Sequence, residues 1–362
     1  MATETITKEE LEALSFPHLP PFPGDIPTAP LHRLSLVKLR DVPGESVKLF
    51  SSSKDLGFFY LDLRGDELGE RILARAEKLF DVGFKLYDLG SHELRQYDHH
   101  SEGSYVGYKR YGAMKADDEG NADRNEFYNG MADEDSIKMP KDDFLEISKN
   151  PYPHPQLLLD NKQEIAKYME DAHELVLLIL SHLNDQLHLP PDTLGRLHRR
   201  TAISGNQARI IKSLPQPESD RRIALKQHTD YGSITILLNK LGGLQILPPP
   251  SLVVPGTEPE WTYVKPLAGH CIVNLGDAMV KFTNGLLRSN IHRVVNPPGA
   301  QAGETRYSLA YFARPEDEVM LRRLSGSDII PEVDEDVVEK EVSSKDWVQH
   351  RAMSGMINKI PI

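Results

Sequence analysis

The sequence is poor in cysteine and has no long apolar run. Its single cysteine, Cys271, rules out a disulfide within the chain, and its place in the apolar run CIVNL predicts an inert thiol in a buried strand. The longest apolar run, 175–180, is too short to cross a bilayer. The N-terminal stretch MATETITKEELEALSF is acidic and lacks the apolar segment of a signal peptide. These absences predict a reduced, cytoplasmic protein with no membrane partner.

Basic residues are outnumbered by acidic ones. The chain has 42 Lys and Arg against 54 Asp and Glu, a formal net charge of -12. Phosphate backbones and anionic membranes are bound by clustered Lys and Arg, so this balance argues against both, and we expect no nucleic-acid partner. A small anionic substrate remains possible, because one buried arginine can outweigh a diffuse surface field. We expect a monomer or a weak homo-oligomer.

The composition and the predicted secondary structure change along the chain. Residues 1–27 are rich in proline and predict an arm on the surface, and 28–155 predict helices and loops. The apolar stripe within 156–200 predicts a long supporting helix and its connection. Within 201–320, seven or more short β-like runs separated by turn residues predict a sandwich or jelly roll. Residues 321–362 predict a tail and a final helix. Helices on either side of a β-rich segment predict an α+β fold.

The stretch KQHTDYGSITILL places His228 and Asp230 two residues apart at the start of an apolar run. His-x-acid is a weak pattern by itself, and a rival occurs at His100 and Glu102, in a polar stretch with no strand to hold it. In a strand, residues i and i+2 point to the same face. His228 and Asp230 are therefore the better pair of metal ligands.

A metal site needs a third ligand, and His292 in SNIHRVVNPP is the main candidate. The competitor His270 stands at a turn before a buried strand, where capping roles are more common. Two histidines and one carboxylate on one face of an octahedral ion leave three positions open, as in non-haem Fe(II) oxygenases.

An anion site is predicted next to the metal. In RYSLAYFARP, Arg306 and Ser308 share one face of a strand, and Ala310 and Phe312 continue that face. A buried arginine is costly unless an anion meets it. That anion is either a protein carboxylate in a structural ion pair or the carboxylate of a substrate or cosubstrate held by Arg306 with Ser308 as an added donor.

These segments, in this order, resemble the non-haem Fe(II), 2-oxoglutarate-dependent dioxygenases, in the branch that includes isopenicillin N synthase. The resemblance covers about residues 28–320 and includes DLGFFYL, RNEFYNG and CIVNLGDAMVKFTNG. It implies a distorted double-stranded β-helix, or jelly roll, flanked by N-terminal helices and a C-terminal helix. Fe(II) would be held by the ligands predicted above.

By the same resemblance, 2-oxoglutarate would bind the iron and place its far carboxylate on Arg306 and Ser308. Reaction with O₂ would release succinate and CO₂ and oxidise an unactivated C–H bond of a small molecule, such as a specialised metabolite, by hydroxylation, desaturation or rearrangement. One departure weakens the cosubstrate assignment: relatives often have a tyrosine before the proline of the strand that corresponds to ARIIKSLPQP, and here Leu214 takes that place.

Two alternatives stay open. An oxidase resembling isopenicillin N synthase would use O₂ without 2-oxoglutarate, with Arg306 and Ser308 holding a substrate carboxylate. A non-catalytic jelly-roll binding protein would keep the metal site only by ancestry. Substrate contacts are expected from YVGYKRYGAM, where the candidates are Tyr105, Tyr108, Lys109 and Arg110, although its tyrosines can equally pack the edge of the domain.

Overall fold

The computed structural model describes residues 14–99, 106–117, 119–129, 153–254, 256–333 and 341–354. The rival pair His100 and Glu102, the candidate Tyr105 and residues 1–13 of the predicted arm lie outside these ranges. The predicted division of the chain into five regions stays a prediction.

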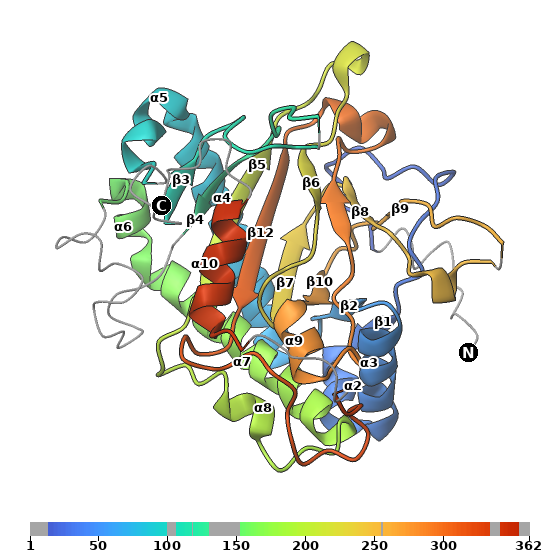
Figure 1. Cartoon of the computed structure of the whole chain (residues 1–362). Helices are drawn as coiled ribbons and strands as arrows, with labels where there is room; N and C mark the ends of the chain where they lie inside the picture. Colours follow the sequence, from blue (N-terminus) through green and yellow to red (C-terminus); the bar gives the residue numbers. More distant parts are fainter. Residues whose placement is uncertain are drawn as a thin grey trace.

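Two β-sheets form the centre of the molecule (Figure 1). The strands are β1 Arg33–Ser35, β2 Phe58–Asp62, β3 Gly107–Lys109, β4 Glu126–Asn129, β5 Gln207–Ser213, β6 Leu225–His228, β7 Ile234–Asn239, β8 Leu244–Ile246, β9 Thr262–Tyr263, β10 His270–Leu275, β11 His292–Val294 and β12 Arg306–Ala313. The eight-stranded sheet has the order β1-β2-β10-β7-β12-β5-β4-β3, and the four-stranded sheet has the order β6-β11-β8-β9. The α+β class and the jelly-roll core are thereby confirmed.

Helices pack against the larger sheet. They are α2 Leu36–Asp41, α3 Pro43–Asp55, α4 Glu67–Asp88, α5 Gly90–Leu94, α6 Gln156–Asp160, α7 Lys162–Gln186, α8 Thr193–Arg196, α9 Asp277–Phe282 and α10 Ser344–Ser354, with short 3₁₀ turns at Arg95–Tyr97, Glu218–Asp220, Pro250–Leu252 and Gly299–Gly303. Figure 1 shows α7 and α8 below the strands and α10 in front of them. The long helix predicted within 156–200 is interrupted at Asn161 between α6 and α7. No helix in the described ranges combines the length and apolar composition that crossing a bilayer requires.

Strand β12 divides its side chains between a core and a cavity. Leu309, Tyr311 and Ala313 belong to the apolar cluster that also contains the buried faces of α4 and α7. The alternate residues Ser308 and Phe312 line a cavity between the two sheets. This alternation follows from the two-residue period of a strand. The larger sheet is therefore apolar on its helix side and carries functional side chains on its inner side.

Candidate metal and cosubstrate site

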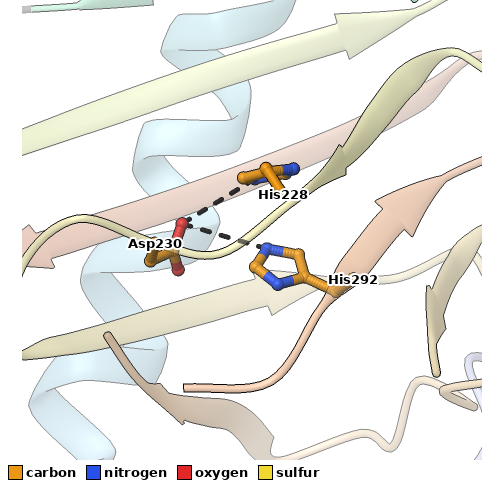
Figure 2. Close-up of side chains that lie close together, drawn as sticks. All are labelled: His228, Asp230 and His292. Carbon is orange, nitrogen blue, oxygen red and sulfur yellow. Dashed lines mark ion pairs between the residues drawn. The ribbon is translucent and has the colours of Figure 1, made fainter. Parts of the chain in front are cut away.

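Three side chains meet at the inner side of the small sheet. The Nε2 atoms of His228 and His292 lie 3.8 and 3.9 Å from Oδ1 of Asp230. One ligand atom from each residue falls within 4.8 Å of the others, and the three side chains point to a common centre (Figure 2). Imidazole nitrogens and a carboxylate oxygen at this spacing fit one divalent transition metal. The arrangement is that of the predicted triad.

Strand pairing brings the two histidines together. His228 ends β6 and His292 begins β11, and the two residues are direct antiparallel partners. Their rings are 4.2 Å apart between centroids. Asp230 lies beyond the end of β6, in the turn to β7, so its side chain is not placed by strand alternation as the sequence reasoning supposed. The turn is held by the amide of Asp277, which donates to the carbonyl of Asp230.

Hydrogen bonds orient each ligand. Nδ1 of His228 lies 2.8 Å from the carbonyl of Lys226, and Nδ1 of His292 lies 3.2 Å from the carbonyl of Asn290. A ring N–H that donates to a carbonyl leaves the other nitrogen as an acceptor, so Nε2 of each ring is available to a metal.

The carboxylate is oriented in the same way. Oδ2 of Asp230 accepts hydrogen bonds from Oγ1 of Thr235 at 2.6 Å and from Nδ2 of Asn274 at 2.7 Å, which leaves Oδ1 toward the imidazoles. Sequence reasoning missed Thr235 and Asn274, because their contacts with Asp230 depend on pairing between β7 and β10.

The protonation of His228 and Asp230 suits metal binding. Burial lowers the pKa of His228 to about 4, with a further contribution from His292. Burial raises the pKa of Asp230, but the two imidazoles and the hydrogen bonds from Asn274 and Thr235 outweigh it, so this pKa lies below its usual value. Neutral imidazole and ionised carboxylate are the forms that bind metals.

The triad opens into a cavity of about 360 Å³ that also contains Arg306 and Ser308. This volume is within the usual range for a small-molecule site. The predicted metal and anion sites therefore lie in one cavity.

Arg306 is a buried cation held by neutral groups. Its side chain donates to the carbonyl of Gly242 at 2.8 Å and to Oγ of Ser308 at 2.5 Å, and only 2% of the residue is exposed. Burial lowers its pKa to about 10. Among the described residues no carboxylate forms an ion pair with it, which favours an external anion over the structural ion pair.

A second donor lies beside Arg306. Ser213 of β5 is its direct strand partner, and Oγ of Ser213 is buried with no hydrogen-bond partner in the described part of the chain. A buried hydroxyl without a partner is costly, and a ligand oxygen would satisfy it. Leu214, in place of the family's tyrosine, is 44% exposed. The residues present fit 2-oxoglutarate without that tyrosine, and Ser213 was not found from sequence because its role depends on the register with β12.

The predicted substrate residues lie apart from this cavity. Tyr108 and Lys109 are fully buried in β3, where the Tyr108 hydroxyl donates to Glu126 and the Lys109 ammonium pairs with Asp123, while Arg110 is exposed. None of the three lines the cavity, so their contact with substrate stays a prediction. The nearby residues that do line it are Met114 and Lys115.

We expect the buried Lys109–Asp123 pair to stabilise the hairpin that carries Met114 and Lys115. Lys109→Met leaves the Asp123 carboxylate buried without its cation and should lower the free energy of unfolding by about 3 to 5 kcal/mol, measured by urea denaturation. The variant Lys109→Met/Asp123→Asn, whose amide oxygen still accepts from the amide of Met114, should recover most of the loss. Equal losses in the single and double variants would show that the ion pair is not the cause.

The competing histidine and the predicted final helix are also placed. His270 is bound by Arg33, with Nε to Nε2 at 3.3 Å, and lies 3.5 Å from Asp62, outside the metal cluster. Helix α10 begins at Ser344, Trp347 packs against the core, and Arg351 lines the cavity.

Comparison with known proteins agrees with this geometry. The family profile of the 2OG-Fe(II) oxygenase superfamily matches residues 205–315. A 2-oxoglutarate-dependent dioxygenase of Aspergillus fumigatus is 30% identical over 350 residues, covering 91% of this chain and 87% of that protein. The 2-oxoglutarate-dependent dioxygenase gloE of Glarea lozoyensis is 28% identical over 299 residues, covering 82% and 83%.

Among solved structures, full-length Neurospora crassa T7H in complex with alpha-KG superposes with a TM-score of 0.72 at 19% identity, covering 92% of this chain and 98% of that one. This likeness supports the fold. The sequence relatives favour the 2-oxoglutarate-dependent enzyme over the oxidase and the binding protein. The chain belongs to the 2OG-Fe(II) oxygenase superfamily and is a 2-oxoglutarate-dependent dioxygenase that uses Fe(II) and O₂.

Proposed function

We propose that His228, Asp230 and His292 hold Fe(II) and that Arg306 and Ser308 hold the far carboxylate of 2-oxoglutarate, so that the enzyme oxidises a C–H bond of a small organic molecule. The substrate we expect is a specialised metabolite, in keeping with the fungal dioxygenases that this chain resembles. The observation that carries the proposal is the buried Arg306 guanidinium, which shares a cavity with the triad and has no carboxylate partner among the described residues.

The iron would supply the oxidation chemistry, and residues of the chain orient its ligands. When bound, the iron would supply the oxidation of the C–H bond with O₂, coupled to decarboxylation of 2-oxoglutarate to succinate and CO₂. Thr235 and Asn274 fix the Asp230 carboxylate, and the carbonyls of Lys226 and Asn290 fix the two rings.

The side chains that line the cavity orient the bound anion and exclude water. Arg306 and Ser308 orient an anion at one end of β12, and the apolar side chains of Leu237, Phe127 and Phe312 keep water away from the space between. A dry pocket strengthens the electrostatic contacts inside it and protects a reactive oxidant.

An anaerobic titration tests these roles. Fe(II) and 2-oxoglutarate added to the protein should produce a visible charge-transfer absorption band, and candidate substrates with O₂ should release one succinate per product. Iron binding without the band, together with substrate oxidation that yields no succinate, would favour the oxidase that uses O₂ alone and would contradict the assignment of Arg306.

A further inference from the structure

A buried histidine, His198, lies behind the segment that carries the ligand Asp230. Asp230 belongs to residues 230–233, which lie between β6 and β7, and we call this segment the metal loop. The first three residues of the metal loop line the cavity, whereas the fourth, Ser233, is fully buried. Ser233 therefore joins the loop to the core on the side away from the cavity.

The backbone of the metal loop is held from two sides. The amides of residues 276–278, at the start of α9, donate to the carbonyls of three loop residues at 2.8 to 3.0 Å. On the other side, the amide of Ser233 donates to the carbonyl of Ala313 in β12 at 2.9 Å. The packing is close, because a Cβ atom on Gly232 would lie 2.4 Å from the carbonyl oxygen of Ala313. These contacts fix the path of the loop, and the Ser233 side chain adds a further one.

The Ser233 hydroxyl donates to His198. Its Oγ atom lies 2.6 Å from Nε2 of the His198 ring, and Nδ1 of the same ring lies 2.7 Å from the carbonyl of Leu194. Because a carbonyl can only accept, Nδ1 carries the ring hydrogen, and Nε2 accepts from the hydroxyl. Burial lowers the pKa of His198 to about 4, so the ring is neutral and keeps this arrangement at neutral pH.

His198 is itself fixed by three further elements. Its carbonyl accepts from Nε2 of His173 in α7 at 2.8 Å, and Nδ1 of His173 lies 3.0 Å from the hydroxyl of Tyr311 in β12. Its ring meets that of Phe282, the last residue of α9, edge to face, with the centroids 6.5 Å apart. The Ser233 hydroxyl is therefore bound to a group that α7, β12 and α9 hold in place.

The position of the metal loop bears directly on metal binding. A carboxylate oxygen binds a divalent metal at about 2.0 to 2.2 Å, and the side chains of such a site must be held within about 0.5 Å of the required geometry. Ser233 is three residues from Asp230 in the same loop, and two residues before Thr235, which orients the Asp230 carboxylate. Loss of the contact with His198 would let the loop, and with it the Asp230 carboxylate, move by such an amount.

We propose that His198 is a positioning residue for the iron site: it holds Ser233, and through Ser233 the metal loop, so that Oδ1 of Asp230 stays directed at the two imidazoles. His198 does not line the cavity, so it acts through the loop and not by contact with substrate or cosubstrate. This inference rests on the proposed function, which assigns the ligands, and adds a residue that sets the affinity of the site for its metal. A histidine with a purely structural role would stabilise the fold and leave the iron affinity of the folded protein unchanged.

Two hydroxyl deletions separate these roles. Ser233→Ala removes the hydroxyl that donates to His198, and the matched control Tyr311→Phe removes the hydroxyl that donates to His173, one step farther from the loop. Each deletes one buried hydrogen bond to a histidine ring, so both should lower the Tm of the metal-free protein by a comparable amount. Fe(II) titrated anaerobically into each folded variant, and followed by calorimetry, should bind Ser233→Ala about 3- to 10-fold more weakly and Tyr311→Phe with unchanged affinity.

Substitutions of His198 supply a second test. His198→Leu leaves the Ser233 hydroxyl buried without an acceptor and should weaken Fe(II) binding at least as much as Ser233→Ala. His198→Gln, whose amide oxygen can accept from that hydroxyl, should recover most of the affinity. The charge-transfer band of the complex with Fe(II) and 2-oxoglutarate should shift in Ser233→Ala and stay in place in Tyr311→Phe, because the energy of the band depends on how the ligands are oriented around the metal.

The inference is overturned if Ser233→Ala binds Fe(II) as tightly as the unmodified protein, or if Tyr311→Phe loses as much affinity as Ser233→Ala. Neither outcome requires His198→Leu to fold, because the two hydroxyl deletions decide the question. Failure of the proposed function would look different: the unmodified protein would then bind no Fe(II), or would bind it as tightly after His292→Ala.

Discussion

His292→Ala should lose Fe(II) and with it all turnover above background. The imidazole of His292 is one of three ligand atoms within 4.8 Å of one another, and no other histidine or carboxylate of the described residues completes the cluster. Loss of an outer hydrogen-bond partner alone usually lowers metal affinity about 10- to 100-fold, so loss of a ligand should exceed about 100-fold. Metal content after gel filtration and the intensity of the charge-transfer band measure the effect directly.

His270→Gln is the control for this prediction. His270 is also buried and also begins a strand, but it contacts Arg33 and Asp62 instead of the triad. The variant should keep its iron and its absorption band, provided that thermal denaturation shows it to be folded. If His270→Gln lost iron while His292→Ala retained it, the ligand set would have to be reassigned.

The inner face of β12 could be read from sequence because strand alternation is a local property. Arg306, Ser308 and Phe312 were placed on one face by the period of two, and the cavity contains all of them. The pairing of His228 with His292 was predicted only as a meeting of two strands, since the register between β6 and β11 depends on residues far apart in the chain. Asp230 lies in the cluster with His228 and His292, but its position depends on a turn, which the two-residue rule does not describe.

The surroundings of Tyr108 and Lys109 could not be predicted from the local sequence pattern. Alternation indicates that neighbouring residues of a strand face opposite ways, but in β3 both Tyr108 and Lys109 are buried, so both faces of this strand are covered. Their partners Glu126 and Asp123 could not be assigned from spacing. The same limit applies to Ser213, which matters only because β5 places it opposite Arg306.

Arg306→Gln should weaken 2-oxoglutarate binding by about 30- to 4000-fold while leaving Fe(II) binding intact. Truncating one partner of a buried, hydrogen-bonded charge pair typically costs about 2 to 5 kcal/mol, which gives this range. Ser308→Ala removes one neutral donor and should cost about tenfold at most. The 2-oxoglutarate concentration that gives half of the maximal charge-transfer absorbance measures both effects.

Thermal stability distinguishes a cosubstrate anchor from a structural arginine. The Arg306 guanidinium is buried, and no carboxylate among the described residues pairs with it. Burial therefore disfavours its charged form, as the lowered pKa of about 10 indicates. Removing the charge should therefore leave the cosubstrate-free protein as stable as before, or more stable. 2-Oxoglutarate with Fe(II) should raise the Tm of the unmodified protein and of Ser308→Ala at saturating concentration, but should raise that of Arg306→Gln much less at the same concentration. The opposite result would be a large drop in the Tm of Arg306→Gln without cosubstrate, combined with unchanged 2-oxoglutarate affinity. It would identify Arg306 as part of a structural ion pair, and the far carboxylate of 2-oxoglutarate would then have to bind a different residue.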